Sequence, residues 1–267
     1  MPRLEELKAE IKDEEILYDL ASAFTEVSAA KIGVLKRNFE ENQSFFQEVS
    51  GLYRLVKSSS GLPATASKGT LAIAMTTNNR FYGVINLEVM KKFLSETQNQ
   101  SVERLVVGKI GASHLKPTGQ EARIEKMVFA HDVPSIEELK DLLEKTKSYQ
   151  QVLLFYPQFK TIYTQTPAVT DITYSPSTPT ATEDLHFIFE PELPKILEFF
   201  ETQIRAILLQ GVLLEMELSV TASRLQAMSR SQEHAREVLE SRRQQLTKAV
   251  HSQINARLLE SLGRVKR

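Results

Sequence analysis

Nine of the ten prolines of this 267-residue chain lie between Pro63 and Pro194, and only Pro2 falls outside that stretch. Proline is the strongest helix breaker, because it lacks the backbone N–H and clashes with the preceding helical turn. The first sixty residues and the last seventy-three are therefore almost free of such breaks. This distribution predicts two long helices at the ends of the chain, separated by a segment of another kind.

The apolar residues of both end segments have helical spacing. In residues 1–60 and 191–267 they follow one another mostly by three, four or seven positions. At ~1.5 Å per residue the two helices would be on the order of 80 and 110 Å long, so each needs a partner helix. We predict that they pair as an antiparallel coiled coil. The predicted seam residues are Leu20, Phe24, Val27, Leu225, Met228, Leu239 and Leu246.

The middle segment, residues 68–190, alternates two patterns. Residues 87–93 and 135–143 have helical spacing, and Ser135 followed by Glu138 fits a helix cap with its reciprocal acid. Alternating strands and helices predict a Rossmann-like α/β domain inserted between the two long helices. The short apolar runs typical of buried strands are 71–75, 105–107, 127–130 and 152–155.

The end of the middle segment contains turn signals. Residues 155–159 are predicted to turn into residues 160–165 and to form a hairpin with them. Residues 166–184 are rich in Pro, Thr and Ser, which predicts an exposed loop. Residues 185–189 then predict a last strand that leads into the second long helix.

Composition and charge exclude several kinds of protein. The chain has no cysteine, which excludes disulfides, thiolate metal sites and a cysteine nucleophile. Its formal net charge of −1 argues against a nucleic-acid-binding protein. The charge is uneven, because residues 1–20 are acidic and residues 220–267 are basic. We expect no membrane-spanning helix, since polar side chains interrupt the most apolar helical stretch, 204–218.

The sequence offers no catalytic, cofactor-binding or metal-binding motif. It contains no phosphate-binding loop, and residues 108–111 are expected to form only a tight turn. The five histidines are scattered without the spacing of metal ligands. We therefore predict no catalytic residue, no cofactor and no metal site.

Several short stretches, in order along the chain, resemble the gamma subunit of F-type ATP synthases, which is their central rotor shaft. The order of a long helix, an inserted α/β domain and a longer helix is also that of the family. The chain departs from the family pattern at Glu26, where a methionine is usual, and in keeping only Gly83 of a glycine pair, which suggests a divergent branch. The matching stretches are LASAFTEVSAAK (20–31), LAIAMTTNNRFYGVIN (71–86), VGKIG (107–111), FKTIYTQTP (159–167), FIFEP (187–191), SRLQAM (223–228) and RLLESLG (257–263).

The resemblance implies a non-catalytic rotor that couples a membrane ion-translocating ring to ATP synthesis or hydrolysis. The implied partners are the alpha and beta subunits of the catalytic hexamer, an epsilon-like subunit and the membrane c-ring. The implied location is the cytoplasmic face of the inner or plasma membrane, as a peripheral subunit. Arg80, Phe81 and Tyr82 could form a local contact surface of the α/β domain, and the favoured alternative is an ordinary turn with buried aromatic side chains. The basic tip expected to contact the catalytic subunits is Arg257, Arg264, Lys266 and Arg267.

Two alternatives remain open at this point. A coiled-coil scaffold or adaptor would account for the long helices but not for the ordered motifs of the middle segment. A specialised F-type-like ATPase that is not devoted to ATP synthesis would account for both. The sequence leaves open whether the coupled ion is a proton or a sodium ion.

Overall fold

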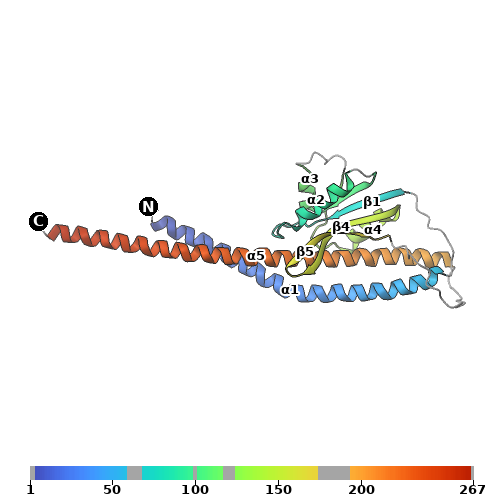
Figure 1. The fold of residues 1–267 in the computed structure, drawn as a ribbon, viewed down its shortest axis with the longest axis horizontal. Coiled ribbons are helices and arrows are strands. Elements are labelled where there is room, and N and C mark those ends of the chain that lie inside the picture. Colours follow the sequence, from blue (N-terminus) through green and yellow to red (C-terminus); the bar gives the residue numbers. More distant parts are fainter. Residues whose placement is uncertain (1–3, 59–67, 99–100, 117–123, 174–192, 266–267) are drawn as a thin grey trace. The chain divides into compact units, whose positions relative to one another are not determined.

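The computed structural model describes residues 4–58, 68–98, 101–116, 124–173 and 193–265. By its contacts the chain divides into two compact units, one made of residues 1–29 and 224–267 and the other of residues 30–223. Figure 1 shows the elements in chain order. They are α1 (Leu4–Ser58), β1 (Lys68–Met75), α2 (Ile85–Thr97), β2 (Glu103–Val107), α3 (Lys109–Leu115), β3 (Glu125–Met127), α4 (Ile136–Lys147), β4 (Tyr149–Thr161), β5 (Thr164–Asp171) and α5 (Leu193–Val265).

The unit 30–223 is built on a five-stranded sheet with the order β3-β2-β1-β4-β5. β1 pairs in parallel with both β2 and β4, and β2 pairs in parallel with β3. β5 pairs antiparallel with β4 and forms one edge, where Pro167 lies opposite Pro157. This order is that of a Rossmann-like sheet. The predicted fold class, two long terminal helices with an inserted α/β domain, is confirmed.

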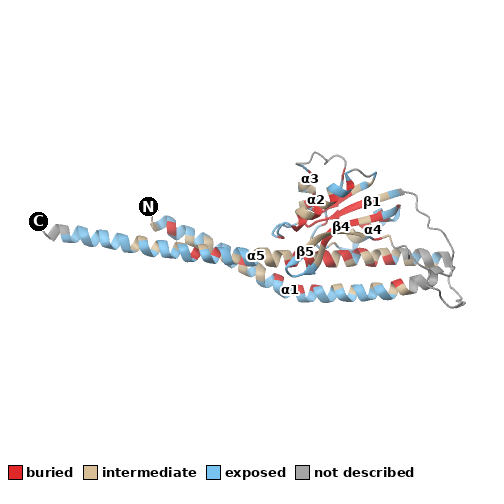
Figure 2. Cartoon of the chain, in the orientation of Figure 1, coloured by how far each residue is buried: buried red, intermediate tan, exposed pale blue. Residues whose placement is uncertain are grey.

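Helices cover both faces of this sheet. On one face, side chains of β1, β2 and β4 pack against Val89, Met90 and Phe93 of α2 and Leu115 of α3. On the other face, the strands pack against α4 and α5, and Leu142 of α4 is fully buried there. Figure 2 shows the resulting concentration of buried residues in the strands. The apolar runs from which buried strands were predicted are thus packed against helices on both faces of the sheet.

Within the unit 30–223, α5 has the sheet on one side and α1 on the other (Figure 1). Ile204 of α5 is fully buried against Phe46 and Val49 of α1. Further along the same pair, Lys31 Nζ lies 2.5 Å from Glu217 Oε1. Residue numbers rise along α1 while they fall along α5, so the two helices are antiparallel as predicted.

In its described residues, the unit formed by residues 1–29 and 224–267 consists of these two helices. Its buried side chains are few and mostly small. Leu7, Ala21 and Ser28 of α1 recur in multiples of seven, and Ala235 and Leu239 of α5 are buried with them. Two ion pairs flank these residues, Arg242 with Glu10 at 3.3 Å and Arg243 with Glu15 at 2.7 Å. Ion pairs therefore join the acidic start of the chain to its basic C-terminal part.

Local predictions in the middle segment were partly right. The α4 cap is confirmed, since the Glu138 N–H donates to Ser135 Oγ and the Ser135 N–H donates to the Glu138 carboxylate. The hairpin is observed as β4 and β5, but its turn lies between Thr161 and Thr164 and not directly after Phe159. Residues 108–111 do not form only a tight turn, because α3 begins at Lys109. Gly108 has φ +98°, and a Cβ there would lie 2.2 Å from the carbonyl oxygen of Thr76.

Two other predictions need correction. The strand predicted over 127–130 is observed as β3, which ends at Met127. The loop predicted over 166–184 is wrong for residues 166–171, which belong to β5. Proline is tolerated there because β5 is an edge strand. The predicted strand 185–189 lies outside the described residues.

One stretch of α5 is apolar enough to resemble a membrane span. An 18-residue window within 202–262 has a mean hydropathy of 1.3, so by length and composition alone the helix could cross a membrane. Half of that window is buried in the protein. Three charged residues of the apolar segment 204–218 have partners inside the unit 30–223. Arg205 donates to the Thr146 carbonyl, Glu215 accepts from Tyr156, and Glu217 pairs with Lys31. We therefore assign this apolar stretch to packing within the protein.

Candidate functional site

The predicted coiled-coil seam is only partly buried. Leu239 is buried, and Leu225, Met228 and Leu246 are half-buried. Phe24 is also half-buried, with the Arg224 guanidinium 5.5 Å from its ring centroid.

Leu20 and Val27 are not seam residues. Their side chains are 49% and 61% exposed, whereas the residues one position further along, Ala21 and Ser28, are buried. The prediction chose the large apolar residues of the repeat, but small residues allow two helices to approach closely. The error therefore amounts to one position on the heptad. It leaves Leu20 and Val27 as an exposed apolar stripe, together with Ile16 and Leu17.

The C-terminal end of α5 carries the predicted basic tip. Every residue from 251 to 262 is exposed, including Arg257. Arg264 lies in α5, while Lys266 and Arg267 lie outside the described residues. The sequence-based prediction considered only charge here and missed a set of large apolar side chains at the same end. The exposed members of this set are Ile254, Leu258, Leu259 and Leu262.

The predicted contact surface Arg80–Phe81–Tyr82 follows β1 and does not behave as one patch. Arg80 is exposed, and Phe81 is 58% exposed with a left-handed backbone, φ +72°. Tyr82 is buried and belongs to the core of the sheet, so it is not available as a contact residue. A non-glycine residue at positive φ is strained and persists only where its surroundings hold it.

Asp132 holds the loop that carries Phe81. Its carboxylate accepts hydrogen bonds from the backbone N–H of Asn78 at 2.6 Å, from Asn79 Nδ2 at 2.7 Å and from the Tyr82 hydroxyl at 2.8 Å. Burial raises the pKa of Asp132, but these hydrogen bonds outweigh it and hold the pKa below the ordinary 3.8. The loops at the carboxyl ends of β1 and β3 are thereby tied together.

The Asn78 side chain extends this network to the residues that follow a third strand, β2. Its Nδ2 donates to the carbonyl of Phe129 at 2.7 Å, and its Oδ1 accepts from the Lys109 N–H at 3.0 Å. Ligands of open α/β sheets bind at this edge. Here the polar groups are bonded to one another, so the arrangement is a structural tie between loops.

A second polar contact missed by the sequence analysis joins α5 to the sheet. The Tyr156 hydroxyl of β4 donates to Glu215 Oε2 at 2.9 Å, and Glu215 is only 9% exposed. Burial raises the pKa of Glu215 above the ordinary 4.5, although bonds from Tyr156 and the Phe159 N–H oppose the rise. Burial and the neighbouring Glu215 charge raise the pKa of Tyr156 to about 12. The sequence feature that could have indicated this contact is an acidic residue, Glu215, within the apolar segment 204–218.

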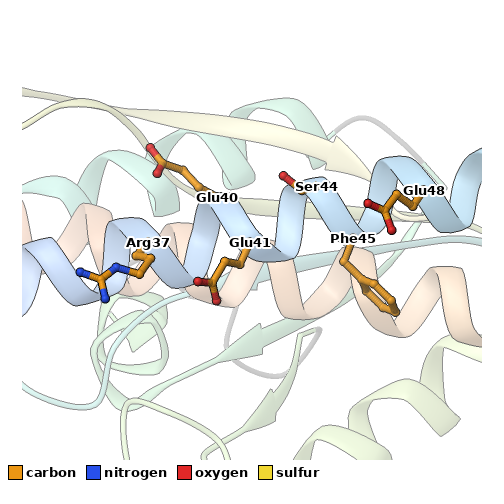
Figure 3. A pocket seen from close by; sticks show the side chains of 6 residues that line it. All are labelled: Arg37, Glu40, Glu41, Ser44, Phe45 and Glu48. Atoms are coloured by element: carbon orange, nitrogen blue, oxygen red, sulfur yellow. The ribbon is translucent and has the colours of Figure 1, made fainter.

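A shallow hollow lies on α1 and is lined by one face of that helix (Figure 3). Since all of its lining residues come from one helix, it has no opposing wall to enclose a small molecule. No group of three or more His, Asp or Glu able to hold a metal occurs among the described residues. The residues lining the hollow are Arg37, Glu40, Glu41, Ser44, Phe45 and Glu48.

Comparison with known proteins identifies the family. A family model described as ATP synthase matches residues 3–263, which is almost the whole chain. The chain belongs to the ATP synthase gamma-subunit family. The gamma subunit is a non-catalytic part of the central stalk. The resemblance inferred from the ordered motifs is therefore confirmed.

Solved structures of this family share the fold. The central stalk of the Tetrahymena thermophila mitochondrial ATP synthase matches with a TM-score of 0.60 and 21% identity, over 79% of this chain and 98% of that chain. A chain of the Euglena gracilis mitochondrial ATP synthase in rotational state 3 matches with a TM-score of 0.57 and 15% identity, over 92% and 94% of the two chains. A chain from the rotor of the Euglena gracilis mitochondrial ATP synthase in rotational state 1 matches with a TM-score of 0.57 and 13% identity, over 92% of this chain and 99% of that chain.

Proposed function

We propose that this chain is the central-stalk rotor of an F-type ATP synthase or ATPase. It would couple rotation of a membrane ion-translocating ring to ATP synthesis or hydrolysis in a hexamer of alpha and beta subunits. The observation that carries the proposal is the family match over residues 3–263. The antiparallel pair of α1 and α5 with its inserted α/β domain supports it.

A rotor must transmit torque, and the paired helices supply stiffness. α1 and α5 run without interruption for 55 and 73 residues. Buried small residues and the two ion pairs Arg242–Glu10 and Arg243–Glu15 join them in the unit of residues 1–29 and 224–267. Exposed ion pairs contribute little energy individually, so the stiffness comes mainly from close packing of the two helices.

A rotor tip must contact its surroundings without binding them tightly. The exposed end of α5 carries Arg257 together with Leu258, Leu259 and Leu262. The basic residues, with Arg264, Lys266 and Arg267, would face acidic surfaces of the catalytic subunits. The apolar residues would provide a smooth bearing surface, because apolar contacts are not directional.

The α/β domain would form the foot of the rotor. Arg80 and Phe81 are exposed on its β1–α2 loop and would contact the epsilon-like subunit or the c-ring. Tyr82 would act from within, by holding the loop through Asp132. In this arrangement the chain is a peripheral subunit of a membrane complex, on the cytoplasmic face of the inner or plasma membrane.

Co-purification tests the assignment. The chain would be co-expressed with the alpha and beta subunits of its own organism, and the complex weighed by native mass spectrometry. A rotor gives one copy for three alpha and three beta subunits. A scaffold or adaptor gives no such complex, and that result would contradict the proposal.

Two sets of tip variants separate charge from apolar contact. One set changes Arg257, Arg264, Lys266 and Arg267 to glutamine, and the other changes Leu258, Leu259 and Leu262 to serine. We expect both to lower the torque measured from single rotating complexes, with the first effect weakening at high salt because exposed charges are screened. Full torque in a complex that lacks residues 257–267 would contradict a contact role for the tip.

A further inference from the structure

The contact between α5 and the α/β domain has an apolar part and a polar part, both within the unit 30–223. The apolar part consists of Leu209, Val212, Met216 and Val220, all buried in the core of the sheet. At about 100° per residue these four positions fall on one narrow stripe of the helix. Apolar packing holds the helix against the sheet, but it is not directional and resists rolling of the helix weakly.

The polar part reaches three different elements, and Glu215 accepts from the backbone N–H of Phe159 in β4 as well as from Tyr156. Arg205 Nη1 donates to the carbonyl of Thr146, in the last turn of α4, at 2.9 Å. Glu215 Oε2 accepts from the Tyr156 hydroxyl of β4 at 2.9 Å. Ser223 Oγ donates to the carbonyl of Tyr82, in the β1–α2 loop, at 2.7 Å.

The three residues are not collinear on the helix surface. Arg205 and Ser223 are eighteen residues apart, which is five whole turns, so they lie on one line parallel to the helix axis. Glu215 lies about 80° around the helix from that line. Two bonds on one line act as a hinge about which a helix can still roll, whereas a third bond beside the line prevents rolling.

We propose that the Glu215–Tyr156 hydrogen bond is the contact that stops α5 from rolling on the α/β domain, so that torque passes from the foot into the long helix. This inference rests on the proposed rotor function. Glu215 and Tyr156 are positioning residues, since neither contacts a substrate.

The burial of Glu215 supports the proposal. A carboxyl group that is 9% exposed loses hydration, and an apolar side chain of similar size would pack against the sheet without that cost. The acid gains a directional bond that an apolar residue could not form. The second bond of the Tyr156 hydroxyl, to Thr170 Oγ1 at 3.2 Å, fixes the orientation of the hydroxyl from β5.

A distance measurement in the full chain tests the contact itself. The chain has no cysteine, so two introduced cysteines carry spin labels without background. Lys140→Cys on α4 and Gln210→Cys on α5 place the labels on exposed positions of the two elements. We expect one narrow label-to-label distance in the parent chain and a broadened distribution in Glu215→Leu, which loses both bonds of the carboxylate. Tyr156→Phe should broaden the distribution less, because the bond from the Phe159 N–H remains.

Two further variants make the measurement specific. Glu215→Gln keeps an oxygen that accepts from Tyr156, so we expect it to retain the narrow distance. Glu217→Leu is the matched control, because Glu217 lies two residues away on α5 and pairs with α1 instead of the sheet. An unchanged distance in both Glu215→Leu and Tyr156→Phe would overturn the proposal, as would equal broadening in Glu217→Leu.

Rotation of the assembled complex tests the mechanical role. With a bead attached to the α/β domain of a complex whose hexamer is fixed, we expect larger torsional fluctuations in Glu215→Leu than in Glu215→Gln or Glu217→Leu. Equal fluctuations would overturn the torque role. Failure of the unmodified chain to assemble with alpha and beta subunits would instead contradict the rotor function, while the distance measurement would still test the contact.

Discussion

The hydroxyl of Tyr82 donates a hydrogen bond to Oδ2 of Asp132 across 2.8 Å, which ties the β1–α2 loop to the loop after β3. Asp132→Asn replaces a carboxylate that accepts from four groups by an amide whose nitrogen can only donate. We expect a loss of about 1–3 kcal/mol in the free energy of unfolding at pH 7. Urea denaturation measures it, and Asp141→Asn on the exposed side of α4 is the control.

The loss should depend on pH. Because the folded-state pKa of Asp132 lies below the ordinary 3.8, the carboxylate contributes stability above that value and loses it as the pH falls through the folded-state pKa. The difference between the parent chain and Asp132→Asn should therefore be complete at neutral pH and shrink in acid. A difference that is constant from pH 7 to pH 3 would contradict this account.

Glu215→Gln should show the opposite pH trend. Burial raises the pKa of Glu215 above 4.5, so its neutral form suits the folded state and its stability contribution is lost as the pH rises through the folded-state pKa. The glutamine keeps the bond from Tyr156 and cannot ionise. We expect the variant to gain stability over the parent chain as the pH rises above 4.5, and denaturation curves from pH 4 to pH 8 measure the gain. A gain that does not grow with pH would contradict the prediction.

Gly108→Ala should be strongly destabilising. The new Cβ would meet the Thr76 carbonyl oxygen at 2.2 Å, and φ is +98°. We expect a loss of at least about 2 kcal/mol, measured as a lower thermal midpoint. Gly69→Ala is the matched control, because a Cβ there meets nothing within 4 Å. Its effect should stay within about 0.5 kcal/mol, and a comparable loss at both glycines would show that space is not the cause.

Seam and surface residues of the helix pair should respond differently. Leu239 is 6% exposed, so Leu239→Ala should cost about 2–4 kcal/mol, through lost burial and a cavity. Leu20→Ser should change the free energy of unfolding by no more than about 0.5 kcal/mol, because Leu20 is exposed. Denaturation of the full chain tests both, and a large loss in Leu20→Ser would restore Leu20 to the seam.

Much of the fold could be predicted because the signals are periodic. Proline marked the inserted domain, and helical spacing marked α1 and α5. It was harder to predict which residues of α1 face α5. Leu20 and Ala21 are neighbours in the sequence, and which of them is buried depends on how closely the two helices approach. Residues 166–171 of β5 were missed because their composition is that of a loop, which an edge strand tolerates.

The polar contacts between residues far apart in the sequence could not be predicted, unlike the local Ser135–Glu138 cap. Asp132 is bonded to residues fifty or more positions away, and Glu215 to a residue 59 positions away. No local pattern encodes such pairs. An isolated acid in an apolar helix, or a non-glycine residue at positive φ, becomes informative only when the neighbouring elements are in place.

The facing prolines of β4 and β5 have a consequence for assembly. Neither Pro157 nor Pro167 has an N–H, so they occupy a pair whose backbone groups point away from each other. At Pro167 that direction is the outer edge of the sheet formed by the described strands, and a backbone donor is therefore missing there. A passing strand that tried to extend the sheet would meet this gap, so the prolines guard against unwanted strand addition in a crowded complex.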